Sequence, residues 1–128
     1  MTQERLKLGR RGEEIAAQWL RGLGYTLIAR NARTAAVRGE IDLIALDRPA
    51  LVFVEVKTLS VLARAGPEVP ALAVGARKRS KLRSLATAWL RENRGALPGF
   101  AELRFDVVGL RLDGDGRVLD REHLRGAF

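Results

Sequence analysis

The stretches that decide the fold are Ile41-Asp-Leu-Ile-Ala-Leu46 and Leu51-Val-Phe-Val-Glu-Val56, which lie close together in the chain. Both runs are rich in residues that favour β-strands, and the four residues between them include Pro49. This pattern is typical of a β-hairpin. Proline cannot donate a ladder hydrogen bond, so we expect it in the turn. The sequence therefore predicts two antiparallel strands joined by a tight turn.

Helices and further strands are expected on both sides of this hairpin. Apolar residues at helical spacing predict helices over residues 8–23 and 75–93, and Gly24 is placed as the cap of the first helix. Strands are predicted over residues 25–29, 103–108 with an extension at 110–112, and 118–119; residues 30–38 are predicted as a basic loop, and 61–73 as an exposed, mobile loop. This order predicts one α/β domain over residues 1–128, with a central mixed sheet flanked by helices.

The composition narrows the possible chemistry. The 128 residues include no cysteine and one histidine, which excludes disulfides, thiolate zinc sites, a cysteine nucleophile and a histidine-built metal cluster. Any metal must therefore bind carboxylate oxygens, and Mg²⁺ or Mn²⁺ fits best. No apolar run resembles a signal peptide or a membrane span, so we predict a cytoplasmic protein.

The charge balance favours a polyanionic partner. Twenty-three Lys and Arg oppose fifteen Asp and Glu, which gives a net charge of +8. Phosphate contacts gain from such an excess through counterion release. The alternative is a generally arginine-rich composition with no bound partner.

Three charged residues of the hairpin are expected to meet. If the turn is centred between Arg48 and Pro49, Asp42 falls opposite Glu55. Residues two apart in a strand share a face, so Glu55 and Lys57 point the same way. Two carboxylates and an ammonium would then gather at one edge of an apolar sheet.

This grouping is costly unless a cation compensates the carboxylates. A divalent metal held by Asp42 and Glu55 would do so and would suit phosphodiester hydrolysis. Lys57 would then position the attacking water or stabilise charge on the phosphate. The alternative is an acid–lysine pair that only bridges two strands.

Two more acids are candidates for this site. Glu13 borders the apolar stripe of the first helix and is placed within reach of Asp42, although it is also a typical first-turn glutamate. Glu40 shares a face with Asp42 and is either an outer ligand or a solvated charge.

Candidate phosphate contacts lie in the second helix and in the loop before Asp42. They are Lys78 and Arg79 in the helix, and Arg30, Arg33 and Arg38 in the loop. Most cations of the second helix can also be read as a solvated face. Lys78 differs, because it lies one turn before Leu82 on the apolar face. Trp19 and Trp89 are predicted in the core, and Asp106 is predicted to pair with a neighbouring arginine.

These motifs together resemble a known family. Gly39-Glu-Ile-Asp42 followed by Phe53-Val-Glu-Val-Lys57 is similar to the signature of the YraN-like family, bacterial proteins with a restriction-endonuclease-like fold. The similarity runs nearly end to end and includes Gly9-x-x-Gly-Glu13, Gly24-Tyr25, Asn31-x-Arg33, Lys78, Arg104-Phe-Asp-Val-Val108 and Ala127-Phe128. The frame of an Asp followed by Glu-x-Lys also resembles archaeal Holliday-junction resolvases and other PD-(D/E)xK nucleases.

The resemblance implies a metal-dependent nuclease; we expect DNA as its substrate in preference to RNA, although the sequence leaves that choice open. It implies that Asp42 and Glu55 are metal ligands, that Lys57 is the catalytic lysine, and that Glu13 is an accessory acid near a second metal or its water. Junction DNA and a homodimer are implied by the resolvases. The family usually has an arginine where this chain has Leu59, which puts one phosphate contact in doubt. The alternatives are a nucleic-acid-binding module of the same fold and an interaction protein whose carboxylates form salt bridges.

Overall fold

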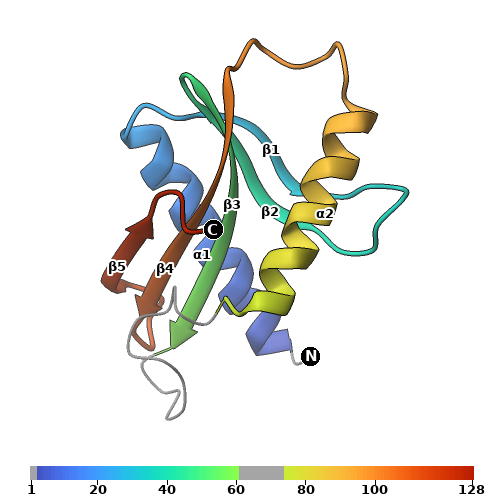
Figure 1. Cartoon of the computed structure of the whole chain (residues 1–128). Coiled ribbons are helices and arrows are strands. Elements are labelled where there is room, and N and C mark those ends of the chain that lie inside the picture. Colours follow the sequence, from blue (N-terminus) through green and yellow to red (C-terminus); the bar gives the residue numbers. More distant parts are fainter. Residues whose placement is uncertain (1–2, 61–73) are drawn as a thin grey trace.

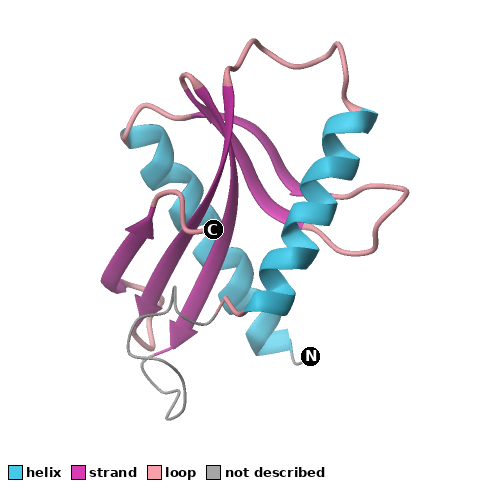
Figure 2. Cartoon of the chain, viewed as in Figure 1, coloured by secondary structure: helices cyan, strands magenta, loops and turns pink. Residues whose placement is uncertain are grey.

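A single twisted sheet with one helix on each face makes up the protein, as seen in a computed structural model that describes residues 3–60 and 74–128 (Figures 1 and 2). The elements in chain order are α1 (Gln3–Gly22), β1 (Thr26–Ala32), β2 (Ile41–Asp47), β3 (Ala50–Ser60), α2 (Ala76–Glu92), β4 (Glu102–Leu112) and β5 (Val118–Leu124). The predicted mixed α/β architecture is confirmed. It is compatible with a restriction-endonuclease-like fold.

The strands lie in the same order in the sheet as in the sequence. β1, β2 and β3 form an antiparallel meander, β3 and β4 are parallel, and β5 returns antiparallel to β4. The parallel pair requires a crossover connection, and α2 lies in that connection. α2 is therefore held over the sheet face that it crosses (Figure 1).

The β2–β3 hairpin has the predicted register. Leu43 pairs with Val54 and Ile44 with Phe53, and the turn is formed by Arg48 and Pro49. Because a slip of one residue would move every side chain to the other face, this register determines which residues of β2 and β3 can form a site.

Each face of the sheet has its own core. Val52, Val54 and Val56 of β3 pack on the face covered by α1, whereas Leu51 and Phe53 pack under α2. This alternation is the predicted one. Trp89 of α2 is buried against the sheet as predicted, and Trp19 packs half-buried at the margin of the α1 core.

Several element boundaries differ from the prediction. Arg30 lies within β1, not in a loop, because β1 remains paired with β2 as far as Ala32. β5 is longer than expected because its charged residues pair with β4. The predicted loop over residues 61–73 lies outside the described residues. Gly24 has a positive φ of 97° and ends α1 as predicted. None of the helices found in residues 3–60 and 74–128 is long and apolar enough to cross a membrane.

Candidate active site

The two hairpin carboxylates lie one step beyond the last pair of the β2–β3 ladder. Leu43 and Val54 form that pair, so Asp42 and Glu55 are the next residues on the two strands. The backbone N–H of Val56 donates to Asp42 Oδ2 at 2.8 Å. The Asp42 side chain is therefore tied to the strand that carries Glu55, and the two predicted acids are brought together.

Glu55 is buried with few partners. Its side chain is only 5% exposed, and Oε1 lies 3.5 Å from Lys78 Nζ and 3.9 Å from Lys57 Nζ. Its second oxygen, Oε2, is buried and has no hydrogen-bond partner among the described residues. A buried carboxylate oxygen normally finds a donor or a cation, so this oxygen needs an explanation.

Both carboxyl groups hold a proton more tightly than usual. Burial, together with the nearby charge of Glu55, raises the pKa of Asp42 to about 7. Burial also raises the pKa of Glu55, although Lys78 and Lys57 oppose that change. Two carboxylates with raised pKa values in one place favour the binding of a proton or a metal ion.

Glu13 approaches this pair from α1. Gly12 allows the approach, because a Cβ at that position would overlap Thr58 of β3. The Glu13 carboxylate accepts hydrogen bonds from the Asn31 amide at 2.9 and 3.3 Å. Its charge contributes to the raised pKa values of both Asp42 and Glu55.

The three acids do not form one cluster, however. In the described part of the chain, no three Asp, Glu or His side chains are close enough together to hold a metal ion. The Glu13 oxygens are instead engaged by Asn31. The arrangement found here is thus an Asp42–Glu55 pair with Glu13 nearby. Glu40, the other extra candidate, pairs with Arg33.

Asn31 is a site residue that the sequence reasoning did not single out. It is the one non-glycine residue with positive φ, 46°, among the described residues. Asparagine tolerates this conformation better than most residues. A cavity of about 180 Å³ opens beside it and is lined by both Asn31 and Glu13. The signal available in the sequence was the Asn31-x-Arg33 motif of the family resemblance, although residues 30–38 were predicted as a loop and Asn31 lies near the end of β1.

The predicted cations are placed in different ways. Lys78 points at the site, as its position on the apolar face of α2 suggested, and pairs with Glu55. Arg30 pairs with Glu14 at 2.7 Å, and Arg33 pairs with Glu40. Arg79 donates to the carbonyl of Val74 and lies over the ring of Phe128, whereas Arg38 is exposed in the β1–β2 loop.

Asp106 belongs to a separate, fully partnered network. Arg104 Nε donates to it at 2.8 Å, which confirms the predicted arginine pair, and His123 Nε2 lies 2.8 Å away. The Tyr25 hydroxyl and the Gly126 N–H also donate to it. Burial acts to raise the pKa of Asp106, but the hydrogen bonds outweigh it and hold the pKa at about 2.

Comparison with known proteins places the chain in a family. The sequence model of the group described as "Uncharacterised protein family UPF0102" matches residues 12–110. The chain belongs to this family. That assignment supports the YraN-like resemblance, and residues 12–110 include Glu13, the hairpin and Lys78.

Individual UPF0102 members are similar over nearly their whole length. A UPF0102 protein of Syntrophotalea carbinolica is 41% identical over all of this chain and 96% of its own length. One from Rhodococcus opacus is 43% identical over 96% of this chain and 97% of its own. One from Solibacter usitatus is 43% identical over 94% of this chain and 84% of its own. The similarity therefore covers all the elements that carry the site.

Proposed function

We propose that this UPF0102 protein is a metal-dependent nuclease that hydrolyses DNA phosphodiester bonds, with branched or junction DNA as the first substrates to test. The observation that carries the proposal is the Asp42–Glu55 pair. Both carboxyls have raised pKa values, and one buried oxygen of Glu55 has no hydrogen-bond partner among the described residues. A cytoplasmic location, where DNA is accessible, is part of the same proposal.

The donor set suits a hard divalent cation. Mg²⁺ and Mn²⁺ prefer carboxylate oxygens, and these ions often bind through only one or two carboxylates while keeping several waters. Asp42 and Glu55 would hold the ion, and Glu13 would contact a second ion or a bound water. When bound, such an ion polarises a phosphoryl oxygen and lowers the pKa of a coordinated water.

The chain's own residues supply orientation and charge. The Val56 N–H holds the Asp42 carboxylate in place. Lys57 is half-buried, with its ammonium 3.9 Å from Glu55 Oε1, where it can orient a water or stabilise negative charge on the phosphate. Lys78 is more exposed and approaches the same Glu55 oxygen from helix α2. A phosphate at the acid pair would meet both ammonium groups.

A second candidate function is a nucleic-acid-binding module with little or no catalysis. The net charge of +8 favours it as much as it favours a nuclease. A pure binder, however, has no use for two adjacent carboxylates that repel phosphate, so the acid pair favours the nuclease.

Nicking of supercoiled plasmid and cleavage of a four-way junction test the proposal. We expect wild-type protein to cut with Mg²⁺ or Mn²⁺ and to be silent in EDTA, and we expect Glu55→Gln and Lys57→Ala to lose at least about 100-fold in rate. Asp120→Asn, which changes an exposed carboxylate of β5, is the matched control and should cut normally. Silence of the wild type on every substrate would exclude the nuclease, as would equal cutting by Glu55→Gln.

A further inference from the structure

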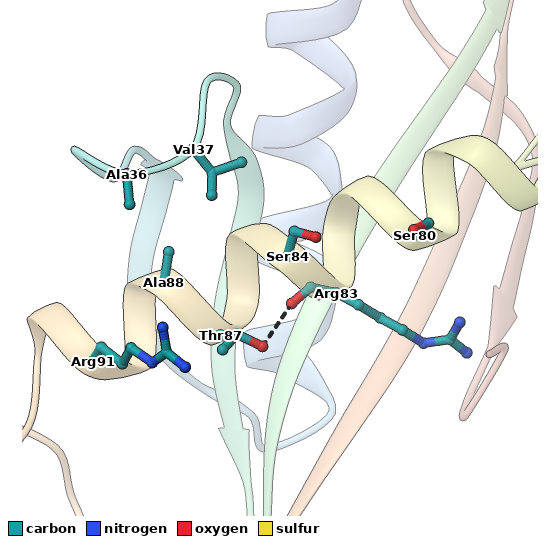
Figure 3. Close-up of a pocket in the computed structure, with 8 residues that line it drawn as sticks. All are labelled: Ala36, Val37, Ser80, Arg83, Ser84, Thr87, Ala88 and Arg91. Atoms are coloured by element: carbon teal, nitrogen blue, oxygen red, sulfur yellow. Dashed lines mark hydrogen bonds between the residues drawn. The ribbon is translucent and has the colours of Figure 1, made fainter.

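A cavity of about 430 Å³ lies between the outer side of α2 and the loop that joins β1 to β2 (Figure 3). The loop contributes Ala36 and Val37, which point toward the helix. The helix contributes Ser80, Arg83, Ser84, Thr87, Ala88 and Arg91. We call this cavity the α2 groove. None of the residues of the acid pair lines it, so it is distinct from the candidate active site.

The loop side of the groove is held in place by hydrogen bonds. The Thr34 hydroxyl donates to the carbonyl of Val37 at 3.0 Å and accepts from its N–H at 3.1 Å. The N–H of Ala35 donates to Glu92 at the end of α2. Near the end of the loop, a Cβ on Gly39 would contact the side chains of Leu85 and Lys81, so the backbone there lies close to α2. The groove is therefore a preformed feature of the fold.

The helix side of the groove is strongly basic. From Ala76 to Arg91, α2 carries six lysines and arginines and no acid. Arg77, Ser84 and Arg91 recur at spacings of seven residues and share the helix face that borders the groove. Arg77 and Arg91 form no ion pair with the rest of the described chain. Arg91 therefore lines one end of the groove, and Arg77 lies just before Ser80, the first helix residue that lines the other end.

The start of α2 makes this charge costly. Its N-terminus has no side-chain capping bond and no acidic residue in the first turn. Arg77, Lys78 and Arg79 lie in that turn, where the helix dipole disfavours cations. A bound polyanion would offset both the dipole and the mutual repulsion.

The side chains in the groove match a sugar–phosphate backbone. Arg91 lies in the groove, whereas Arg83 extends away from the loop, with its guanidinium over the ring of Phe128 (Figure 3). The Thr87 hydroxyl donates its hydrogen bond to the carbonyl of Arg83 and is not available to a ligand as a donor. This leaves two serine hydroxyls and one guanidinium as donors, next to the small apolar surfaces of Ala36, Val37 and Ala88. Donors suit phosphates, and the apolar patches suit sugars.

We propose that the α2 groove binds the backbone of duplex DNA and guides it to the acid pair; this rests on the proposed nuclease function. Lys78 contacts Glu55 and lies in the same turn of α2 as Ser80, so the first turns of the helix carry both the start of the groove and a residue of the candidate active site. The groove continues from Ser80 to Arg91, which lies roughly 16 Å further along the helix axis. Two of the arginines chosen from the sequence, Arg30 and Arg33, are engaged with glutamates, and the groove offers an alternative path.

Binding of a short fluorescein-labelled DNA duplex in EDTA, measured across a salt series, tests the groove. Arg91→Ala should weaken binding several-fold at low salt and reduce the salt slope by about one phosphate contact. The matched control is Arg21→Ala. Both arginines lie in the last turn of a helix, but α1 covers the opposite face of the sheet. Arg21→Ala should leave the slope unchanged.

A second pair of variants tests the floor of the groove. Ser84 is exposed, so substitution there leaves the core intact. Ser84→Glu should weaken duplex binding at least about tenfold by repelling phosphate, and Ser84→Gln, of similar size, should weaken it less. Circular dichroism and the melting temperature check that all variants fold.

The outcomes separate this proposal from the nuclease. Equal losses of duplex affinity in Arg91→Ala and Arg21→Ala would contradict the proposal that the α2 groove binds DNA. The absence of duplex binding by wild type at the lowest salt would contradict it as well. If wild type nicks plasmid while Arg91→Ala binds duplex normally, the groove is wrong and the nuclease stands. If the groove variants behave as expected but wild type never cuts, only the nuclease fails.

Discussion

Two carboxylate sites on the same sheet, Asp106 and the Asp42–Glu55 pair, differ in their partners. Asp106 in β4 is completely buried and is contacted by Arg104, His123, Tyr25 and a backbone N–H. In the Asp42–Glu55 pair, Glu55 is buried and Asp42 half-buried, but a buried oxygen of Glu55 has no partner among the described residues. The pKa of Asp106 is lowered to about 2, whereas that of Asp42 is raised to about 7.

The difference separates a structural acid from a functional one. The Asp106 network joins β4 to β5 and to the segment after it, because His123 and Gly126 both bind Asp106. All its interactions are satisfied within the chain, and it has nothing to offer a ligand. The Asp42–Glu55 pair lowers the stability of the fold at neutral pH, and such a cost is expected at a functional site.

The largest expected effect is on the structural side. Asp106→Ala should lower the free energy of unfolding by about 3–5 kcal/mol, because it removes the buried acceptor of several hydrogen bonds and leaves half-buried Arg104 paired with Asp47 alone. Urea unfolding followed by circular dichroism measures the change. Asp120→Ala, on the exposed part of β5, should cost far less. A loss in Asp106→Ala no greater than in this control would remove the contrast between the two groups.

Substitution in the Asp42–Glu55 pair should change the free energy of unfolding in the opposite direction. In metal-free buffer at pH 7, Asp42→Asn should raise the free energy of unfolding by on the order of 2–4 kcal/mol, because it removes a charge that burial and Glu55 disfavour. The folded pKa of Asp42 is above its usual value of 3.8, so wild-type stability should fall as pH rises from about 4 to 7. Unfolding curves across this window should be flatter for the variant. A destabilised Asp42→Asn would contradict the interpretation.

A bound metal ion should reverse the loss of stability that the Asp42–Glu55 pair causes. At 100 times its dissociation constant, Mn²⁺ should stabilise the wild type by about 2.7 kcal/mol. Glu55→Gln should abolish this gain, whereas Asp120→Asn should retain it. Melting temperatures with Mn²⁺ and with EDTA measure the effect without any substrate. The same shift in Glu55→Gln as in wild type would place the ion elsewhere.

Acid should remove the stabilising contribution of Asp106. Its folded pKa lies below the usual 3.8, so its stabilising contribution is complete above about pH 4 and is lost as pH falls toward 2. We expect wild type to lose on the order of 2 kcal/mol across this window in excess of the loss in Asp106→Asn. Parallel acid unfolding curves for the two proteins would show that Asp106 is not the group that titrates.

The smallest expected effect concerns the link between Asn31 and Glu13. Asn31→Gly keeps the positive φ but removes the amide, and should lower nuclease activity or metal affinity roughly tenfold. Asn31→Ala should have the same effect and should also lower stability, since alanine disfavours this backbone conformation. In a Glu13→Gln background, Asn31→Gly should have little further effect on activity. Additive losses would mean that Asn31 acts independently of Glu13.

Local patterns were sufficient for much of the fold. The hairpin register followed from the position of Pro49, and the faces of β3 followed from alternation, because both depend only on residues close in sequence. The boundaries of β1 and β5 did not follow, since their polar residues become strand only by pairing with β2 and β4. Lys78 was placed correctly because its position on the apolar face of a helix can be counted.

The sequence by itself determined the mixed α/β fold, the pairing of Asp42 with Glu55 and the absence of cysteine or histidine metal chemistry, because composition and short-range periodicity carry that information. Only the tertiary structure decided which carboxylate is satisfied and which is not. Asp106 finds Tyr25 some eighty residues away, and Asn31 engages Glu13 across two elements. Such partners are distant in the chain, and only packing brings them within hydrogen-bond distance.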